Sequence, residues 1–258
     1  MEWDTVRFER EEQVGYVILD RPASLNAVND QLILDLESAC QAIQREADLR
    51  IVVVKGEGRA FCSGMDLTAA AHRPPTPEAL TAAWLPWMRA LHILEELPQL
   101  TIASVHGPCL GAGFELTLAC DFRIAATTAF FSSPQVLYGS PADAGPTYRL
   151  PQWIGLAKAL EIVILGERFN AAQAERWGLL TRVAEPETLA EETKKLADRC
   201  LQVGAKAATA AKFLLRDAAA MDFATLTEAI DRARSDSLAT GELDESMQVY
   251  RERRKPRV

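Results

Sequence analysis

The segment from His106 to Ala126, HGPCLGAGFELTLACDFRIAA, constrains the fold of this chain more than any other. It follows a strand predicted over Thr101 to Val105, and it places three glycines within seven residues. Glycine lets the backbone approach a ligand closely and adopt conformations that other residues avoid. A helix that begins here directs unpaired N–H groups at the space in front of it, and Glu115 lies at its start. The pattern favours a site for a developing oxyanion beside a carboxylate.

A second segment has the same character. The run Ile51 to Lys55 is short, apolar and β-branched, which is typical of a buried strand. It leads through two glycines into RAFCSGMDL, residues 59–67, where Gly64 precedes Met65 in another predicted strand-to-helix turn. Two separate turns that offer backbone N–H groups are what a two-donor oxyanion hole requires.

Together these segments resemble the enoyl-CoA hydratase/isomerase (crotonase) family. Three further segments resemble family motifs in the expected order: LDRPASLNAV at 19–28, FNAAQAERWGLLTRV at 169–183 and the basic tail RERRKPRV at 251–258. The resemblance implies an α/β fold, with a spiral core of ββα turns over residues 1–200 and a helical C-terminal region over 201–258. It also implies that these last helices mediate trimer contacts, in a homotrimer or in a hexamer made of two trimers.

The resemblance further implies a reaction. The family stabilises a coenzyme A thioester as an enolate-like anion, with coenzyme A entering as part of the substrate and no permanently bound cofactor. Carried over residue by residue, the two oxyanion donors are the backbone N–H groups of Met65 and Ala112. Glu115 matches the first catalytic glutamate and would act as general base or acid beside the acyl α-carbon. The alternative is that Glu115 is a capping carboxylate favoured by the helix dipole.

The sequence departs from the hydratase pattern twenty positions later. Typical hydratases carry a second glutamate there, whereas this chain has Gln135, whose amide cannot exchange a proton at neutral pH. Asp143, eight residues further on, has the spacing of an aspartate that dienoyl-CoA isomerases and a hydrolytic dehalogenase use. Gln135 could equally be a polar group that lines the pocket, and Asp143 could equally be a turn residue.

Contacts to coenzyme A and to the acyl group also follow from the resemblance. The candidate binding positions are Ser24, Leu25, Ala27, Asp66, Leu67, Thr68, Gly111, Leu137, Tyr138, Tyr250 and Lys255. The side chains of Trp84, Trp87, Met88 and Phe114 are expected in the acyl pocket together with Leu137 and Tyr138, although Trp84 and Trp87 also fit a core.

Composition excludes several other classes. The formal net charge of −8 argues against nucleic acid as the main partner. No apolar run approaches the ~20 residues that a membrane helix needs, so no membrane partner is expected. The five cysteines include no CxxC pair and the chain begins with no secretory segment, which together predict reduced core thiols and a cytoplasmic protein. The three histidines, His72, His92 and His106, lack metal-ligand spacing, so no metal is expected.

Hydrophobic periodicity and capping signals predict the main elements. Asn29 is a candidate N-cap, and Asn170 with Gln173 forms a candidate capping box. Pro86 is expected to kink or restart the second helix. Strands are predicted at 6–11, 15–20, 51–55 and 101–105, with two more between 121 and 132. Helices are predicted at 29–46, 78–97, 186–201, 206–219 and 223–250, the last with a break near Gly241, and a Pro-rich loop at 69–77.

These observations leave a short set of functions. An enoyl-CoA hydratase or an enoyl-CoA double-bond isomerase fits best, and the chemistry of a dienoyl-CoA isomerase or of a hydrolase remains open. A homologue that binds coenzyme A thioesters without turnover is a further alternative, because Gln135 replaces a catalytic carboxylate. A serine hydrolase of related architecture is disfavoured because the chain contains no GxSxG elbow.

Overall fold

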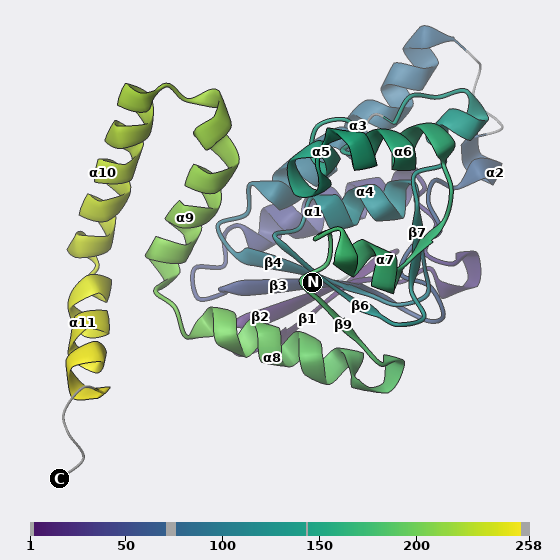
Figure 1. Ribbon diagram of the computed structural model, residues 1–258. Coiled ribbons are helices and arrows are strands. Elements are labelled where there is room, and N and C mark those ends of the chain that lie inside the picture. The colour runs from purple at the N-terminus through teal and green to yellow at the C-terminus, as the bar shows by residue number, and fades with distance from the viewer. Residues whose placement is uncertain (1–2, 71–75, 143, 254–258) are drawn as a thin grey trace. The chain divides into compact units, whose positions relative to one another are not determined.

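The computed structural model describes residues 3–70, 76–142 and 144–253 (Figure 1). The chain divides into two compact units, Met1–Lys195 and Leu196–Val258. The division falls inside the helix α8 (Leu189–Leu201), a few residues before the expected boundary at 200.

Among the described residues of the first unit, six strands form one sheet in the order β1-β2-β3-β4-β6-β9. β1 pairs with β2 in antiparallel register, and every later neighbour is parallel. The central strand β3 reads IVVVKG and its first four residues are buried, as expected for a parallel strand covered on both faces. The bounds are β1 (Val6–Glu11), β2 (Val14–Leu19), β3 (Ile51–Gly56), β4 (Leu100–Val105), β6 (Phe122–Ala126) and β9 (Arg182–Ala184).

A second sheet, over the same described range, has the order β5-β7-β8. Its strands are β5 (Pro108–Leu110), β7 (Phe130–Ser132) and β8 (Phe169–Asn170). Consecutive strands alternate between the sheets: β4 is followed by β5, and β6 by β7. The helix α4 (Ala112–Leu118) completes the turn that begins with β4 and β5. This arrangement confirms the predicted α/β spiral of ββα turns.

Two long helices, α1 (Asp30–Ile43) and α3 (Pro77–Glu95), pack against each other. Asn29 caps α1 by accepting a hydrogen bond from the Leu32 N–H at 3.0 Å, as predicted. α3 runs through Pro86 as one helix, so the expectation that Pro86 restarts it is wrong. The buried side chains of Trp87, Leu91 and Leu94 follow this proline. Their packing holds the helix together despite the missing N–H of the proline.

Shorter helices connect these elements. They are α2 (Leu67–Ala70), α5 (Leu150–Ile154), α6 (Leu156–Leu165), α7 (Ala171–Arg176) and three 3₁₀ turns, η1 (Pro22–Ser24), η2 (Gln135–Tyr138) and η3 (Pro186–Thr188). The capping box of Asn170 and Gln173 at the start of α7 is present as predicted. α2 includes the first two residues of the loop expected at 69–77, and residues 71–75 lie outside the described residues. No helix in the described parts of the chain is long and apolar enough to cross a membrane.

The second unit is helical. It contains α9 (Ala205–Asp217), the 3₁₀ turn η4 (Ala218–Ala220), α10 (Phe223–Ala239) and α11 (Glu242–Arg253). α9 packs against α10, and Gly241, with a φ of 77°, separates α10 from α11. The predicted break near Gly241 is therefore confirmed.

The five cysteines are free and buried, which agrees with the prediction of core thiols. Burial raises the pKa of the Cys62 thiol to about 12 and raises the pKa of Cys40 and Cys109 as well. All three thiols are therefore neutral near pH 7.

Candidate functional site

The two glycine-rich turns lie face to face. Gly64 has a φ of 103° and Gly111 a φ of 48°, conformations that side chains rarely adopt. A Cβ atom on Gly64 would lie 3.0 Å from the Leu110 carbonyl oxygen and 3.9 Å from the Ala112 nitrogen. A side chain at Gly64 would thus enter the space between the turns.

Two backbone N–H groups at these turns are left for a ligand. The Val28 N–H donates to the Gly64 carbonyl and the Asp66 N–H donates to the Val28 carbonyl, both at 2.8 Å. Because alternate residues of a paired segment present their N–H groups to opposite sides, the Met65 N–H points away from Val28. Within the described residues, neither the Met65 N–H nor the Ala112 N–H donates to another protein group. Ala112 is the first residue of α4, so its alanine side chain causes no strain.

Glu115 lies one helical turn after Ala112, and its side chain is buried, with 3 % of its surface exposed. Its Oε1 accepts a hydrogen bond from the Gln135 Nε2 at 2.5 Å. Its Oε2 accepts one from the Trp87 Nε1 at 2.8 Å. Side chains three residues apart on a helix share a face, so the Glu115 carboxylate lies on the same face of α4 as the Ala112 side chain. A capping carboxylate exposed to solvent does not fit this environment.

Gln135 is the residue expected from the family resemblance to replace a second carboxylate. The Ser133 hydroxyl donates to its Oε1 at 2.9 Å, which directs the amide nitrogen at Glu115. The segment that carries Ser133 and Gln135 is joined to the turn at Gly111, because the Gly111 N–H donates to the Ser132 carbonyl at 2.9 Å. The site therefore contains one carboxylate and one amide, joined by a hydrogen bond.

Trp87 is a site residue whose role the sequence did not indicate. Its ring is 1 % exposed, so it fits the predicted core, yet its N–H reaches Glu115 from a different helix. Trp84 and Met88 on the same helix are half-buried. Phe114, expected in the acyl pocket, is fully buried in the core, where its ring contacts those of Phe131 and Phe169.

The RPASLNA segment supports the turn at Gly64 through Asn26, a residue that the sequence analysis did not single out. Asn26 is fully buried with a φ of 55°. Its Nδ2 donates to the carbonyls of Glu57, Ala60 and Phe61 at 2.9, 2.8 and 3.2 Å. Leu25, beside it, accepts from the Ser63 N–H at 3.0 Å. The segment thus fixes the backbone that leads to Met65.

The predicted binding positions differ in how accessible they are. Leu67, Leu137 and Tyr138 are exposed by 59, 64 and 70 %, and Ser24 and Thr68 are exposed too. Ala27 and Gly111 are buried, Leu25 is half-buried, and the half-buried Asp66 pairs with Arg21 at 3.3 Å. Tyr250 belongs to α11, but its side chain is outside the described part, and Asp143, Lys255 and His72 lie outside the described residues altogether.

The remaining histidines have other surroundings. The His106 Nε2 donates to the Gly58 carbonyl at 2.9 Å, which ties the turn after β4 to the turn after β3. His92 is exposed on α3. Among the described residues, no group of three or more His, Cys, Asp or Glu side chains could hold a metal ion.

This fold and this pair of turns have clear relatives. The family model "Enoyl-CoA hydratase/isomerase" matches residues 9–258, and the chain belongs to that family. The protein named "Probable enoyl-CoA hydratase echA8" from Mycobacterium bovis is 34% identical over 246 residues, which cover 95% of this chain and 88% of the relative.

Solved structures agree. The crystal structure of an enoyl-CoA hydratase from Bacillus anthracis matches with a TM-score of 0.91 and 30% identity, covering 98% of each chain. A protein from Thermobifida fusca, whose name gives it provisionally as an enoyl-CoA hydratase, was crystallised in complex with CoA. It matches with a TM-score of 0.83 and 29% identity, covering 92% of this chain and 93% of that one.

Proposed function

We propose that this chain is an enzyme of acyl-CoA thioesters that forms an enolate-like anion, and that it moves a carbon–carbon double bond. The thioester oxygen would accept hydrogen bonds from the backbone N–H groups of Met65 and Ala112. Their lack of partners among the described residues supports this role. Each such donor contributes about 3 kcal/mol of transition-state stabilisation in comparable sites.

Glu115 would carry the proton. For a 3-enoyl thioester, its carboxylate removes a proton from C2, and the electron pair moves onto the thioester oxygen as the dienolate forms. The protonated Glu115 then returns the proton at C4, the double bond moves to C2–C3, and the carboxylate is regenerated. One carboxylate is sufficient for both transfers, because the proton leaves and returns on the same group.

The hydrogen bond between Gln135 and Glu115 is the observation that favours double-bond isomerisation over hydration. An amide at 2.5 Å from the carboxylate can orient it but cannot donate or accept a catalytic proton at neutral pH. A hydration that divides the proton transfers between two carboxylates therefore lacks its second group at this position.

Mass-resolved turnover in deuterated water tests the proposal. The panel contains 3-enoyl, 2-enoyl, dienoyl and aromatic enoyl-CoA thioesters. We expect a shifted double bond with no added water, and deuterium enters the product to the extent that protonated Glu115 exchanges with solvent before it returns the proton. We expect Glu115→Gln to abolish turnover while thioester binding stays nearly intact. Unchanged turnover in Glu115→Gln would refute the role of Glu115, and thioester binding without turnover across the whole panel would indicate a catalytically silent homologue.

Hydration is the second candidate, because the Mycobacterium bovis relative is named a probable hydratase. In that case Glu115 would activate water and Gln135 would only orient it. A product heavier by one water would establish this reaction. Gln135→Glu, which restores the usual pair of carboxylates, is then expected to raise hydration relative to isomerisation.

We further propose that the chain assembles as a homotrimer or as a hexamer of two trimers. In the second unit, the large apolar side chains of Leu215 and Phe223 are 82 and 83 % exposed, and their burial between subunits would favour assembly. Light scattering after size exclusion gives the mass directly. Phe223→Glu is expected to lower the mass, while a monomeric wild-type chain would refute the proposal.

A further inference from the structure

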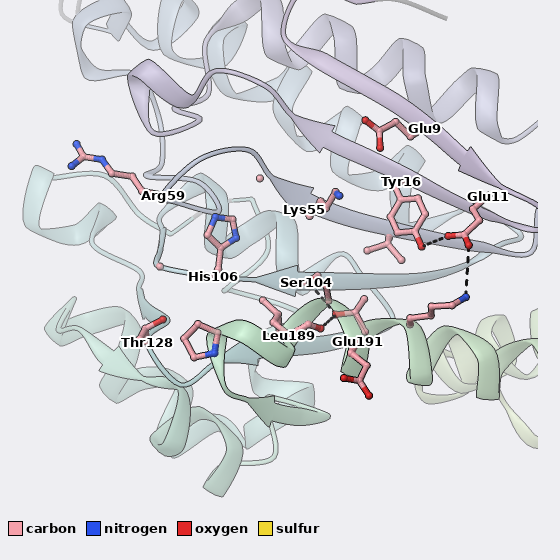
Figure 2. Close-up of a pocket in the computed structure, with 17 residues that line it drawn as sticks. Glu9, Glu11, Tyr16, Lys55, Arg59, Ser104, His106, Thr128, Leu189 and Glu191 are labelled. Atoms are coloured by element: carbon pink, nitrogen blue, oxygen red, sulfur yellow. Dashed lines mark hydrogen bonds and ion pairs between the residues drawn. The ribbon is translucent and has the colours of Figure 1, made fainter.

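A cavity of about 940 Å³ lies within the first unit between the sheet and α8 (Figure 2). Tyr16, Val53, Lys55 and Ser104 reach it from the three adjacent strands β2, β3 and β4. The Ser104 and Thr193 hydroxyls are hydrogen-bonded at 3.0 Å, which fastens the start of α8 over this face. Met65, Trp87, Ala112, Glu115 and Gln135 are not among its lining residues, so it is separate from the site described above.

The basic and acidic side chains that line this cavity lie at different positions along its length. Figure 2 shows Arg59 and His106 at one end and Glu11 at the other, with Lys55 and Tyr16 between them. The carboxylates have cationic partners: Glu11 pairs with Lys194 at 4.0 Å and accepts a hydrogen bond from the Tyr16 hydroxyl at 3.4 Å. Glu9 and Glu191 also have cationic partners, Arg7 at 3.2 Å and Lys195 at 2.6 Å.

Two cations of the cavity, Lys55 in its middle and Arg59 at one end, have no such partner in the part of the chain that the structure describes. Within the described residues, no carboxylate pairs with Lys55 or with Arg59. The Lys55 Nζ lies over the ring of Tyr16, 5.2 Å from its centroid, a contact that orients the ammonium group without neutralising it. Uncompensated cations in a concave site raise the local concentration of anions.

The rest of the wall is mostly apolar. Val53, Pro186, Leu189 and Ala190 line it beside the charged groups. Small-molecule sites typically combine such an apolar wall with a few polar groups that fix orientation, at volumes of roughly 300–1,000 Å³. The cavity is therefore large enough for more than a bare inorganic ion.

We propose that this cavity binds a small organic anion, a phosphate or carboxylate carried on an apolar body, with its charged group held by Lys55 and attracted over a longer range by Arg59 at one end of the cavity. The inference does not depend on the function proposed above. The anionic head would lie beside Lys55 in the middle of the cavity, on the side that faces Arg59, and the apolar body would extend along Val53 and Leu189. Phosphate and carboxylate share the chemistry that lysine and arginine recognise, and the experiment separates them.

Titration calorimetry on the full chain tests the proposal with octyl phosphate, octanoate and inorganic phosphate. We expect saturable binding of at least one octyl probe, about tenfold or more tighter than inorganic phosphate because the apolar chain is buried. Lys55→Met keeps the length and packing of the side chain and is expected to weaken binding about tenfold or more, with Arg59→Gln acting in the same direction.

Lys194→Met is the matched control, because it removes the same charge from the same cavity at the acidic end, where Lys194 pairs with Glu11. Its affinity for the probe is expected to stay within about twofold of wild type. Thermal unfolding of each variant, with Tm close to wild type, confirms that the folds are intact.

The outcomes separate cleanly. Binding of octyl phosphate alone assigns a phosphorylated ligand, and binding of octanoate alone assigns a carboxylate. The proposal is overturned if neither octyl probe binds saturably, if inorganic phosphate binds as tightly as octyl phosphate, or if Lys194→Met weakens binding as much as Lys55→Met. Displacement of the probe by saturating coenzyme A would also overturn it, because the probe would then occupy the acyl-CoA site.

Discussion

Replacement of Trp87 by phenylalanine tests the hydrogen bond that holds Glu115. The change keeps an aromatic ring but removes the N–H that donates to the Glu115 Oε2 at 2.8 Å. Loss of a hydrogen bond to a buried charged group costs about 1.5–3 kcal/mol, and the space left by the smaller ring adds about 1 kcal/mol. We therefore expect the free energy of unfolding to fall by about 2.5–4 kcal/mol.

The measurement is denaturant unfolding at a fixed chain concentration, arranged as a double-mutant cycle with Glu115→Gln. If the indole N–H binds the carboxylate, the two substitutions are coupled by about 1–2 kcal/mol. Trp84→Phe on the same helix is the control, since Trp84 is half-buried and its indole has no hydrogen bond within the described residues. A coupling below about 0.5 kcal/mol between Trp87 and Glu115 would refute the reasoning.

Three further perturbations have defined outcomes. Gly113→Ala places a Cβ 2.5 Å from the Cys62 carbonyl oxygen, so we expect unfolding to become about 1–3 kcal/mol easier and turnover to fall, as denaturant curves and kinetics would show. Asn26→Asp sets a carboxylate against three backbone carbonyls, so we expect a loss of about 3 kcal/mol or more and a lower Tm, whereas an unchanged Tm would contradict the role of Asn26. The raised pKa of the Cys62 thiol means that its neutral form stabilises the fold fully below the ordinary value of 9.0, and that this contribution is lost as the pH rises towards about 12. Iodoacetamide at pH 8 should therefore label the native chain slowly and all five thiols of the urea-unfolded chain quickly, and rapid labelling of native Cys62 would contradict its burial.

Local signals in the sequence predicted where several helices begin and end, while the spiral arrangement of the elements was expected from the family resemblance. The cap at Asn29, the capping box at Asn170 and the break at Gly241 each depend on residues within four positions, and all three are present. The expectation that the helix restarts at Pro86 was wrong for a non-local reason. Whether a proline ends a helix depends on the packing of its neighbours, and that packing comes from α1, far away in the sequence.

The residues of the candidate site also fall into two groups, those that the sequence indicated and those that it did not. Met65, Ala112 and Glu115 were proposed because their glycine-rich turns resemble family motifs, and the structure brings the two turns together. Their roles stay predictions. Trp87 and Asn26 could not be predicted, because their partners lie 28 and more than 30 residues away. Periodicity identifies the buried face of a helix, but it does not say which polar atom on that face meets a carboxylate on another element.

The turns at Gly64 and Gly111 also bear on how this chain could change its chemistry. The two proposed oxyanion donors are main-chain groups, so among replacements of Met65 or Ala112 only proline, which has no N–H, would delete them directly. The groups that would choose among reactions, Glu115 and Gln135, are side chains that a single codon can replace. Most substitutions at Met65 and Ala112 would therefore leave the proposed anion stabilisation in place, whereas any substitution at Glu115 or Gln135 would change the groups that handle the proton. Directed evolution could vary the proton chemistry without rebuilding the two turns.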